Sequence, residues 1–573
     1  MASSPQSWPW SRARGVWPIV LPAALLAWLL AWVFHFGTTL INDEYLAIDY
    51  FYRIVRLGRA YPTPDAFHKP LSVLMGFFAW LTESPLGYEA AVAVFGVIFV
   101  VVLYFALRRE LGASFALAAA VAVSLHPDLM YYTARGSTVI PFCAFTFAAL
   151  LAAHKRDEKW SLWVYAGSLF LAGLIRAEPW VLAAPALYWW WPRHKSARAW
   201  AGLFAALCLI GLAPVIWLGK DYFINHDLMH GFKVAIRVRV VGMGQPFSLL
   251  DALLSFWLKV PNKVSWPVVA GAVAGAVLFV KEKGLRPGLM HPLIVFPALV
   301  SVFLAAVVYL GVYPNPWYFY FDSVFAIIFC LNFFRTVIPR IKMGAGRAAW
   351  TAIMFAAIFI AIAMFLARGG GGLTEGRWLL IAASLICAAL AAVLARPEGV
   401  LSRPRETFLI AALTLISLSF PLMAHTLYQS EIDELRLEAA KQREMAAVAE
   451  FLRREIPEGR GGRIMLPSRR NEQLSWLFRD REPPDTVALR EAFYLSSMKH
   501  IDFLDLHPDW IIYIPADYHF RGPENMFRWL GGQDQTELNG VKISLVMSTG
   551  HIRVFKVTYR PGHAPRGPLP PIP

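Results

Sequence analysis

Apolar runs of membrane-spanning length recur through the first 424 residues of this 573-residue chain. A helix needs about 20 apolar residues to cross the hydrocarbon core of a bilayer, and runs of about 17 still suffice. The chain is 57% hydrophobic and 16% charged, whereas soluble domains average about 45–50% apolar and about 25% charged residues. These values exclude a soluble enzyme, a disordered chain and a disulfide-stapled scaffold. They predict a polytopic α-helical membrane protein.

We predict about thirteen transmembrane helices from these runs. The expected spans are 17–36, 86–107, 113–126, 137–153, 160–176, 179–191, 199–218, 265–281, 289–311, 317–334, 348–367, 377–395 and 407–424. One further run, 71–82, is too short to cross and is expected to lie at the membrane interface or to re-enter the membrane.

Basic residues mark the loops that are expected to stay in the cytoplasm. With a cytoplasmic N-terminus, every second loop contains Lys or Arg, as the positive-inside rule requires. These loops include Arg108 and Arg109, Lys155 and Arg156, Lys281 and Lys283, and Arg335 and Arg340. An odd number of spans then predicts a multi-pass protein of the inner (plasma) membrane with an extracytoplasmic C-terminal domain. The net charge of +15 follows from these loops, so we expect a lipid-bilayer partner and no nucleic acid.

The sequence divides into a multi-span membrane domain, 1–424, and a C-terminal domain, 425–573. Basic and acidic residues balance in the second part, and 431–455 has the periodicity and charge pairs of a helix. Apolar runs with β-strand character follow at 463–466, 510–514, 542–547 and 552–557. We therefore predict a small α/β domain after residue 424.

The first outer loop contains two candidate chemical groups. Asp43 and Glu44 are adjacent carboxylates just after the first span, and acidic residues beside a bilayer are functional candidates. They would act as a general base or as metal ligands, although a solvated loop pair is the structural alternative. His68 and Lys69 precede Pro70 where the chain returns to the membrane. Lys69 would neutralise a lipid phosphate, or it extends to the interface as an ordinary lysine.

Two more outer segments combine an acid with an arginine. Asp128 and Arg135 flank two tyrosines in the second outer loop, and Arg176 and Glu178 end a later span. Asp128 would serve the acceptor and Arg135 a phosphate, whereas Arg176 and Glu178 are expected to form a paired site that binds substrate. A purely structural ion pair is the alternative for both pairs.

These features resemble the GT-C superfamily of polyprenyl-phosphate-sugar glycosyltransferases. The likeness is carried by an acidic pair after the first span, then H-K-P at 68–70, Y-T-A-R at 132–135, R-A-E-P at 176–179, many spans and an outer α/β tail. It looks closest to the branch of the protein O-mannosyltransferases and the lipid A aminoarabinose transferase.

The resemblance implies a membrane glycosyltransferase that moves a sugar from a polyprenyl-phosphate carrier to an extracytoplasmic acceptor, with inversion. The acceptor would be an envelope glycan, a lipid or a protein. By matching position, Asp43 would be catalytic with Glu44 completing the acidic pair, and Lys69 would contact the carrier phosphate. Asp128 and Arg135 match the polar second loop. A divalent cation at the acidic pair is compatible with this chemistry but not required by it.

Three other functional classes remain open from the sequence alone. One is a non-catalytic envelope scaffold or sensor, which would not require the cluster of Asp43, Glu44 and Lys69. An oligosaccharide ligase with a lipid-pyrophosphate donor shares the membrane chemistry, and the cationic outer loop 219–264 suits its donor. A transporter would place broken or short hydrophobic segments at matching positions in two halves, and we find no such symmetry.

Overall fold

The computed structural model describes two parts of the chain. The first part covers residues 17–40, 42–57, 69–191, 196–229, 233, 260–264, 266–309 and 318–337. The second covers residues 432–456, 463–466, 471–478, 485–488, 508–514, 533–538 and 541–560. The predicted spans 348–367, 377–395 and 407–424 and the predicted domain boundary at 424 lie outside the described residues. The thirteen-span count and that boundary therefore stay predictions.

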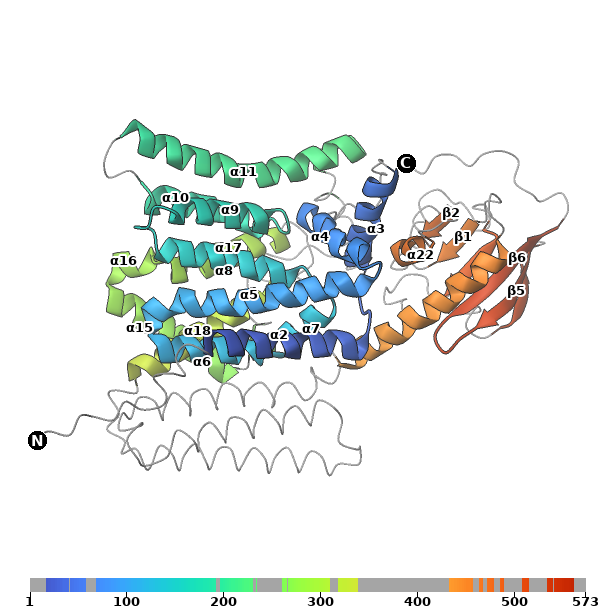
Figure 1. Cartoon of the computed structure of the whole chain (residues 1–573), viewed down its shortest axis with the longest axis horizontal. Coiled ribbons are helices and arrows are strands. Elements are labelled where there is room, and N and C mark those ends of the chain that lie inside the picture. The colour runs from blue at the N-terminus through green and yellow to red at the C-terminus, as the bar shows by residue number, and fades with distance from the viewer. Residues whose placement is uncertain are drawn as a thin grey trace, which may run out of the picture.

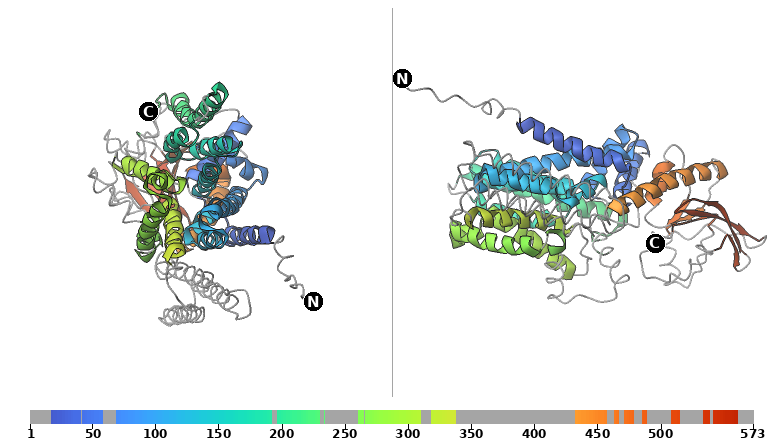
Figure 2. Two further views of the ribbon diagram at one scale, coloured as in Figure 1. Left: turned by 90° about the vertical axis from the view of Figure 1, so that its left-hand side faces the viewer. Right: turned by 90° about the horizontal axis from the view of Figure 1, so that it is seen from below.

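The first part is a bundle of helices that run roughly side by side, with the sheet of the second part beyond one end (Figure 1; Figure 2). We call this the sheet end of the bundle, and the other the far end. The helices are α2 (Trp17–Phe36), α3 (Asn42–Leu57), α4 (Pro70–Leu81), α5 (Pro85–Leu111), α6 (Ala113–Ser124), α7 (Pro127–Ala134), α8 (Val139–His154), α9 (Ser161–Gly173), η1 (Glu178–Leu182), α10 (Ala183–Trp189), α11 (Ala197–Asn225), α14 (Pro261–Val264), α15 (Trp266–Lys283), α16 (Leu285–Leu289), α17 (Pro292–Tyr309) and α18 (Tyr318–Val337).

Local sequence explains where the two longest helices begin. Ser84 caps α5 by accepting a hydrogen bond from the Leu86 amide, and Pro85 occupies the first turn, where its missing N–H costs nothing. Ser196 caps α11 by accepting from the Ala199 amide. Among the described residues, these two helices are long and apolar enough to cross a membrane. The pair α6 and α7, bent by 51°, adds a third if it is one span.

The structure changes three details of the predicted spans. The segment expected as the loop 127–136 is mostly helical, because His126 caps α7 and Pro127 suits its first turn. The span expected at 179–191 is a short 3-10 helix, η1, followed by the seven-residue α10. The span expected at 160–176 shortens to the 13 residues of α9. The run 71–82 forms the 12-residue α4, which packs against α3.

Helices α15 and α18 approach each other closely because α15 presents glycines at one face. A Cβ at Gly275 would lie 1.8 Å from the Phe329 carbonyl oxygen of α18, and one at Gly271 would lie 2.8 Å from Cys330 Sγ. The Asn332 side chain donates to the Gly275 carbonyl at 2.9 Å. Glycines spaced four apart allow such backbone contact between membrane helices.

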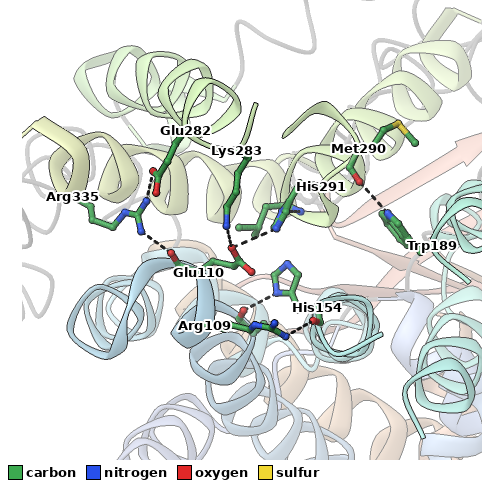
Figure 3. A network of polar contacts seen from close by, with 11 residues as sticks. Arg109, Glu110, His154, Trp189, Glu282, Lys283, Met290, His291 and Arg335 are labelled. Carbon is green, nitrogen blue, oxygen red and sulfur yellow. Dashed lines mark hydrogen bonds and ion pairs between the residues drawn. The ribbon is translucent and has the colours of Figure 1, made fainter. Parts of the chain in front are cut away.

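A polar network joins five segments at the far end of the bundle (Figure 3). Glu110 of α5 accepts from Lys283 Nζ at 2.8 Å and lies 3.5 Å from His291 Nε2. The Arg335 guanidinium donates to the Glu110 carbonyl at 2.7 Å. His154 of α8 packs its ring against that of His291, with centroids 5.2 Å apart. Lys283 and Arg335, which belong to two of the basic clusters predicted for one side of the membrane, thus meet at this end of the bundle.

The second part is a six-stranded mixed sheet with helices. The strands are β1 (Arg463–Leu466), β2 (Asp485–Ala488), β3 (Trp510–Tyr513), β4 (Gln535–Leu538), β5 (Val541–Ser548) and β6 (Arg553–Tyr559), and their order is β2-β1-β3-β6-β5-β4. β1 pairs in parallel with β2 and β3, and the remaining pairs are antiparallel. The short helix α22 (Asn471–Leu477) lies between β1 and β2 in sequence.

A helix over residues 432–455, here the connecting helix, runs from the bundle to the sheet (Figure 1). Its buried residues Met445, Val448 and Leu452 share an apolar core with residues of β1, β3 and β6. Glu444 attaches it to the turn between β5 and β6, because its carboxylate accepts from the His551 amide at 2.8 Å and from the Thr549 hydroxyl.

Candidate functional site

Two short helices at the sheet end, α3 and α7, carry or adjoin several of the predicted site residues that the structure describes. In α7, His126 Nδ1 accepts from the Asp128 amide at 3.1 Å, so the carboxylate of Asp128 lies in the first turn. An acidic group there is favoured by the exposed N–H groups of the helix terminus. The two outer loops that the sequence predicts as functional are therefore built on helices.

The acidic pair begins helix α3. The Glu44 side chain is 1% exposed, and the helical backbone includes Asp43, whose side chain lies outside the described atoms. The next residue, Tyr45, donates its hydroxyl to Gln442 Oε1 of the connecting helix at 2.6 Å. Gln442 in turn donates to the Leu40 carbonyl at 3.0 Å. The connecting helix thus holds both ends of the segment that carries the acidic pair.

A third carboxylate, Glu89 of α5, lies beside this pair and was missed from the sequence. It is fully buried and accepts from the Thr39 amide at 2.8 Å. The Thr39 hydroxyl donates to the Ala134 carbonyl at 2.7 Å. The charges of Glu44 and Glu89 are close enough to repel each other. The signal for Glu89 was a single acid inside the apolar run 86–107.

Gly136 lets the second outer segment approach Glu89. Its φ is +62°, in the left-handed region that glycine tolerates best. A Cβ there would lie 2.5 Å from Leu40 Cδ2 and 3.2 Å from Glu89 Cγ. The turn that follows α7 therefore depends on glycine for both its backbone conformation and its close contact.

The start of α4 brings the segment that carries Lys69 beside the segment that leads to Arg176 and Glu178. Lys69 precedes that helix and donates from Nζ to Thr138 Oγ1 at 3.1 Å. One residue into the helix, the Leu71 amide donates to the Leu174 carbonyl at 3.3 Å. This bond brings the segment containing Arg176 beside the start of α4.

Arg176 and Glu178 form a buried ion pair. Arg176 Nε donates to Glu178 Oε1 at 2.8 Å, and both side chains are less than a tenth exposed. The guanidinium also lies over the Phe142 ring, 5.3 Å from its centroid. The structure thus shows the ion pair itself, while a role of Arg176 and Glu178 in substrate binding stays a prediction.

Asp128 is paired with a lysine from a distant segment. Lys263 Nζ of α14 lies 2.8 Å from Asp128 Oδ1, and both side chains are buried. His126 Nε2 lies 3.1 Å from the Lys263 carbonyl oxygen. In any reaction at this site, the Asp128 carboxylate would therefore act while it is paired with the Lys263 ammonium group.

Arg135 contacts the connecting helix. Its Nη1 donates to Glu434 Oε1 at 2.8 Å, and the Tyr131 hydroxyl donates to Glu434 Oε2 at 2.8 Å. The sequence did not predict Glu434, because its partner lies 299 residues away along the chain.

The sheet end therefore collects carboxylates and cations where the bundle meets the sheet. His68 lies outside the described residues, so its prediction is not tested. Among the described residues, no group of three or more His, Cys, Asp or Glu side chains is arranged to hold a metal ion. Because the Asp43 side chain is outside that set, a cation at the acidic pair stays a prediction. The described groups can accept a proton on a carboxylate and bind an anion through a cation.

Comparison with known families gives one match. Residues 73–218 match the model of the dolichyl-phosphate-mannose-protein mannosyltransferase family. This segment includes α5 to α9, with Asp128, Arg135, Arg176 and Glu178. No curated protein sequence matches the chain.

Two solved structures share the fold over nearly the whole chain. The chain is similar to ArnT from Cupriavidus metallidurans bound to undecaprenyl phosphate, with a TM-score of 0.57 and 13% sequence identity over 94% of this chain and 98% of that chain. It is also similar to the same protein in the apo state, with a TM-score of 0.56 and 14% identity over 95% of this chain and 98% of that chain.

Proposed function

From the premise that this chain has the fold of the GT-C membrane glycosyltransferases, we propose that it transfers a sugar from a polyprenyl-phosphate carrier to an acceptor at the sheet end. The resemblance drawn from the sequence is confirmed by the family model and by the shared fold. The similar ArnT structure contains undecaprenyl phosphate, which supports a lipid-phosphate donor here. The protein would lie in the inner membrane with the sheet end outward.

The observation that carries this proposal is the hydrogen bond between Leu71, two residues after Lys69, and Leu174, two residues before Arg176, in a helix that packs against α3. A departing phosphate needs cationic groups close to the membrane surface, and Lys69 and Arg176 lie around the start of α4. An acceptor needs a carboxylate that takes its proton, and α3 packs on α4 with the acidic pair in its first turn.

The reaction we propose is a single displacement with inversion. Asp43 takes the proton of the acceptor hydroxyl while that oxygen bonds to the anomeric carbon of the sugar. The bond from the anomeric carbon to the phosphate oxygen breaks at the same time, and its electron pair leaves on the carrier phosphate. Lys69 stabilises the charge that develops there.

Asp128 and Arg135 take supporting roles in this proposal. Asp128, through its pair with Lys263, holds the ammonium group of α14 close to α7. Arg135 lies on the same helix side as the anion-binding Tyr131 hydroxyl and would contact the phosphate of the donor. Arg176 and Glu178 would shape the donor pocket as a rigid pair.

The first test measures sugar transfer from a panel of radiolabelled polyprenyl-phosphate sugars by purified full-length protein. Asp43→Asn is expected to reduce transfer by at least about a hundredfold, the size of a general-base contribution. Asp49→Asn is the matched control, since it removes a carboxylate from the same helix, and it should retain transfer. Unchanged transfer by Asp43→Asn would remove the proposed base.

A second pair of variants tests the phosphate contact. Lys69→Gln is expected to raise the KM for the donor and to lower kcat, and Lys69→Arg should recover part of the loss because it keeps the charge. Size-exclusion profiles of both variants check that they fold. If Lys69→Gln and Lys69→Arg lose equal activity, the charge of Lys69 is not what matters.

A further inference from the structure

The carboxylate of Glu434 occupies an anion site made by the last turn of α7 and by Arg135, the residue that follows it. Tyr131 and Arg135 are four residues apart, so their side chains lie on one face of the helix. The Tyr131 hydroxyl donates to one oxygen of Glu434 and Arg135 Nη1 donates to the other, each at 2.8 Å. Arg135 also donates to the Tyr131 hydroxyl and lies over its ring, 5.1 Å from the centroid.

The two partners of this ion pair are held very differently. The Arg135 side chain is 13% exposed, whereas the Glu434 side chain is 48% exposed. Arg135 is therefore fixed by the bundle and by the Tyr131 ring. Glu434 lies at the surface, where water can solvate its carboxylate as soon as it leaves.

The connecting helix does not depend on Glu434 for its attachment to the bundle. Gln442 contacts the Tyr45 hydroxyl and the Leu40 carbonyl, eight residues or about 12 Å further along the helix. A change of rotamer at Glu434 therefore opens the site on α7 while the helix stays docked.

We propose that Glu434 is a displaceable counter-ion, whose carboxylate holds Arg135 and Tyr131 until the phosphate of the lipid carrier takes its place. This inference rests on the proposed function. Carboxylate and phosphate both present paired oxygens that match the planar fork of an arginine. The C-terminal part of the chain then sets the affinity of the membrane site for its donor.

The test measures binding of polyprenyl phosphate in detergent micelles to full-length protein, with inorganic phosphate as a second arm. Glu434→Gln is expected to bind polyprenyl phosphate about two- to fivefold more tightly than the wild type, the range of a partly exposed charge pair. Inorganic phosphate should show a smaller gain if the lipid chain is needed to reach the site. Glu434→Ala serves as a second variant because alanine favours the helix.

Asp433→Asn is the matched control. It removes the same charge one residue earlier, from a side chain that pairs with Arg436 on the solvent side and is 56% exposed. Its affinity should equal that of the wild type. Equal tightening by both variants would assign the effect to net charge and overturn the inference.

A double variant distinguishes displacement of Glu434 by a phosphate from a role in which Glu434 only positions Arg135. In Arg135→Gln protein, Glu434→Gln should have no further effect on binding, because the carboxylate has lost the group it shields. If Glu434→Gln weakens binding to the wild-type background, Glu434 positions Arg135 and the inference is wrong. If the wild type binds no polyprenyl phosphate at all, the proposed function itself is wrong, whatever the role of Glu434.

Discussion

Gly275 of α15 is expected to be the residue whose enlargement most disturbs the bundle. The Cβ of an alanine would lie 1.8 Å from the Phe329 carbonyl oxygen, and 2.9 Å from the Phe333 amide nitrogen, both on the backbone of α18. A backbone atom cannot turn away as a flexible side chain can. The two helices would therefore have to separate.

The size of the effect follows from that geometry. An ordinary contact begins at 3.4 Å, so the helices must move apart by roughly 1.5 Å to accommodate a methyl group. Overpacking costs about 1–3 kcal/mol, and losing the Asn332 hydrogen bond to the Gly275 carbonyl costs about 1 kcal/mol more. Alanine in place of helical glycine returns up to about 1 kcal/mol. We expect Gly275→Ala to lower the free energy of unfolding by about 1–3 kcal/mol.

The assay is unfolding of purified protein by titration with a denaturing detergent, followed by circular dichroism. Gly211→Ala on α11 is the matched control, because nothing lies within 4 Å of a Cβ at that position. It should leave stability unchanged or slightly raised. If Gly275→Ala unfolds no earlier than Gly211→Ala, the close approach of α15 to α18 does not carry the stability we assign to it.

Three further predictions concern the charged contacts and the turn after α7. Burial raises the pKa of Glu444, but hydrogen bonds from Thr549 and His551 outweigh this effect and lower the pKa overall. The ionised Glu444 carboxylate therefore stabilises the fold above its unfolded pKa of about 4.3. This stabilisation is lost as the pH falls through the lower pKa of the folded state. Glu444→Gln should thus reduce stability at pH 7, and the difference from the wild type should vanish towards pH 3 in fluorescence unfolding curves. Glu110→Gln should cost about 1–3 kcal/mol in the detergent titration, since Lys283 loses a charged partner, and an unchanged midpoint would contradict this. Gly136→Ala should cost about 1–2 kcal/mol for its positive φ alone and should also reduce sugar transfer, and full transfer would show that the turn tolerates a side chain.

Several helices could be predicted from the sequence with close limits. The first span was expected at 17–36 and forms α2 over Trp17–Phe36. The span expected at 137–153 forms α8 over Val139–His154. Hydropathy works here because a backbone in lipid must satisfy its own hydrogen bonds, and a continuous helix does so locally.

The second outer segment was predicted less well. The residues 127–136 read as a polar loop, because Asp128 and Arg135 interrupt the apolar pattern. In the structure they belong to or follow α7, and both charges are paired with distant residues. A hydropathy scale scores a charged residue as polar even when an ion pair with a distant residue allows it to be buried.

The candidate site also contains some residues that the sequence predicted and others that it did not. Residue type and order predicted the candidates Asp43, Glu44, His68, Lys69, Asp128, Arg135, Arg176 and Glu178. The contact of Arg176 with Glu178 needs only a short local turn. The sequence did not predict Glu89, Lys263 and Glu434 as site residues, because each joins the site only through a contact with a residue on another element.

The sequence by itself indicated a multi-pass membrane protein, predicted where most of the described helices run, and pointed to candidate residues that carry chemical groups. These properties depend on short stretches of residues and on the bilayer, so they can be read locally. The tertiary structure alone decided that Lys263 neutralises Asp128 and that Glu434 covers Arg135, 135 and 299 residues apart in sequence. Electrostatic pairing falls off with distance in space and not along the chain, and only packing of the helices brings such charges together.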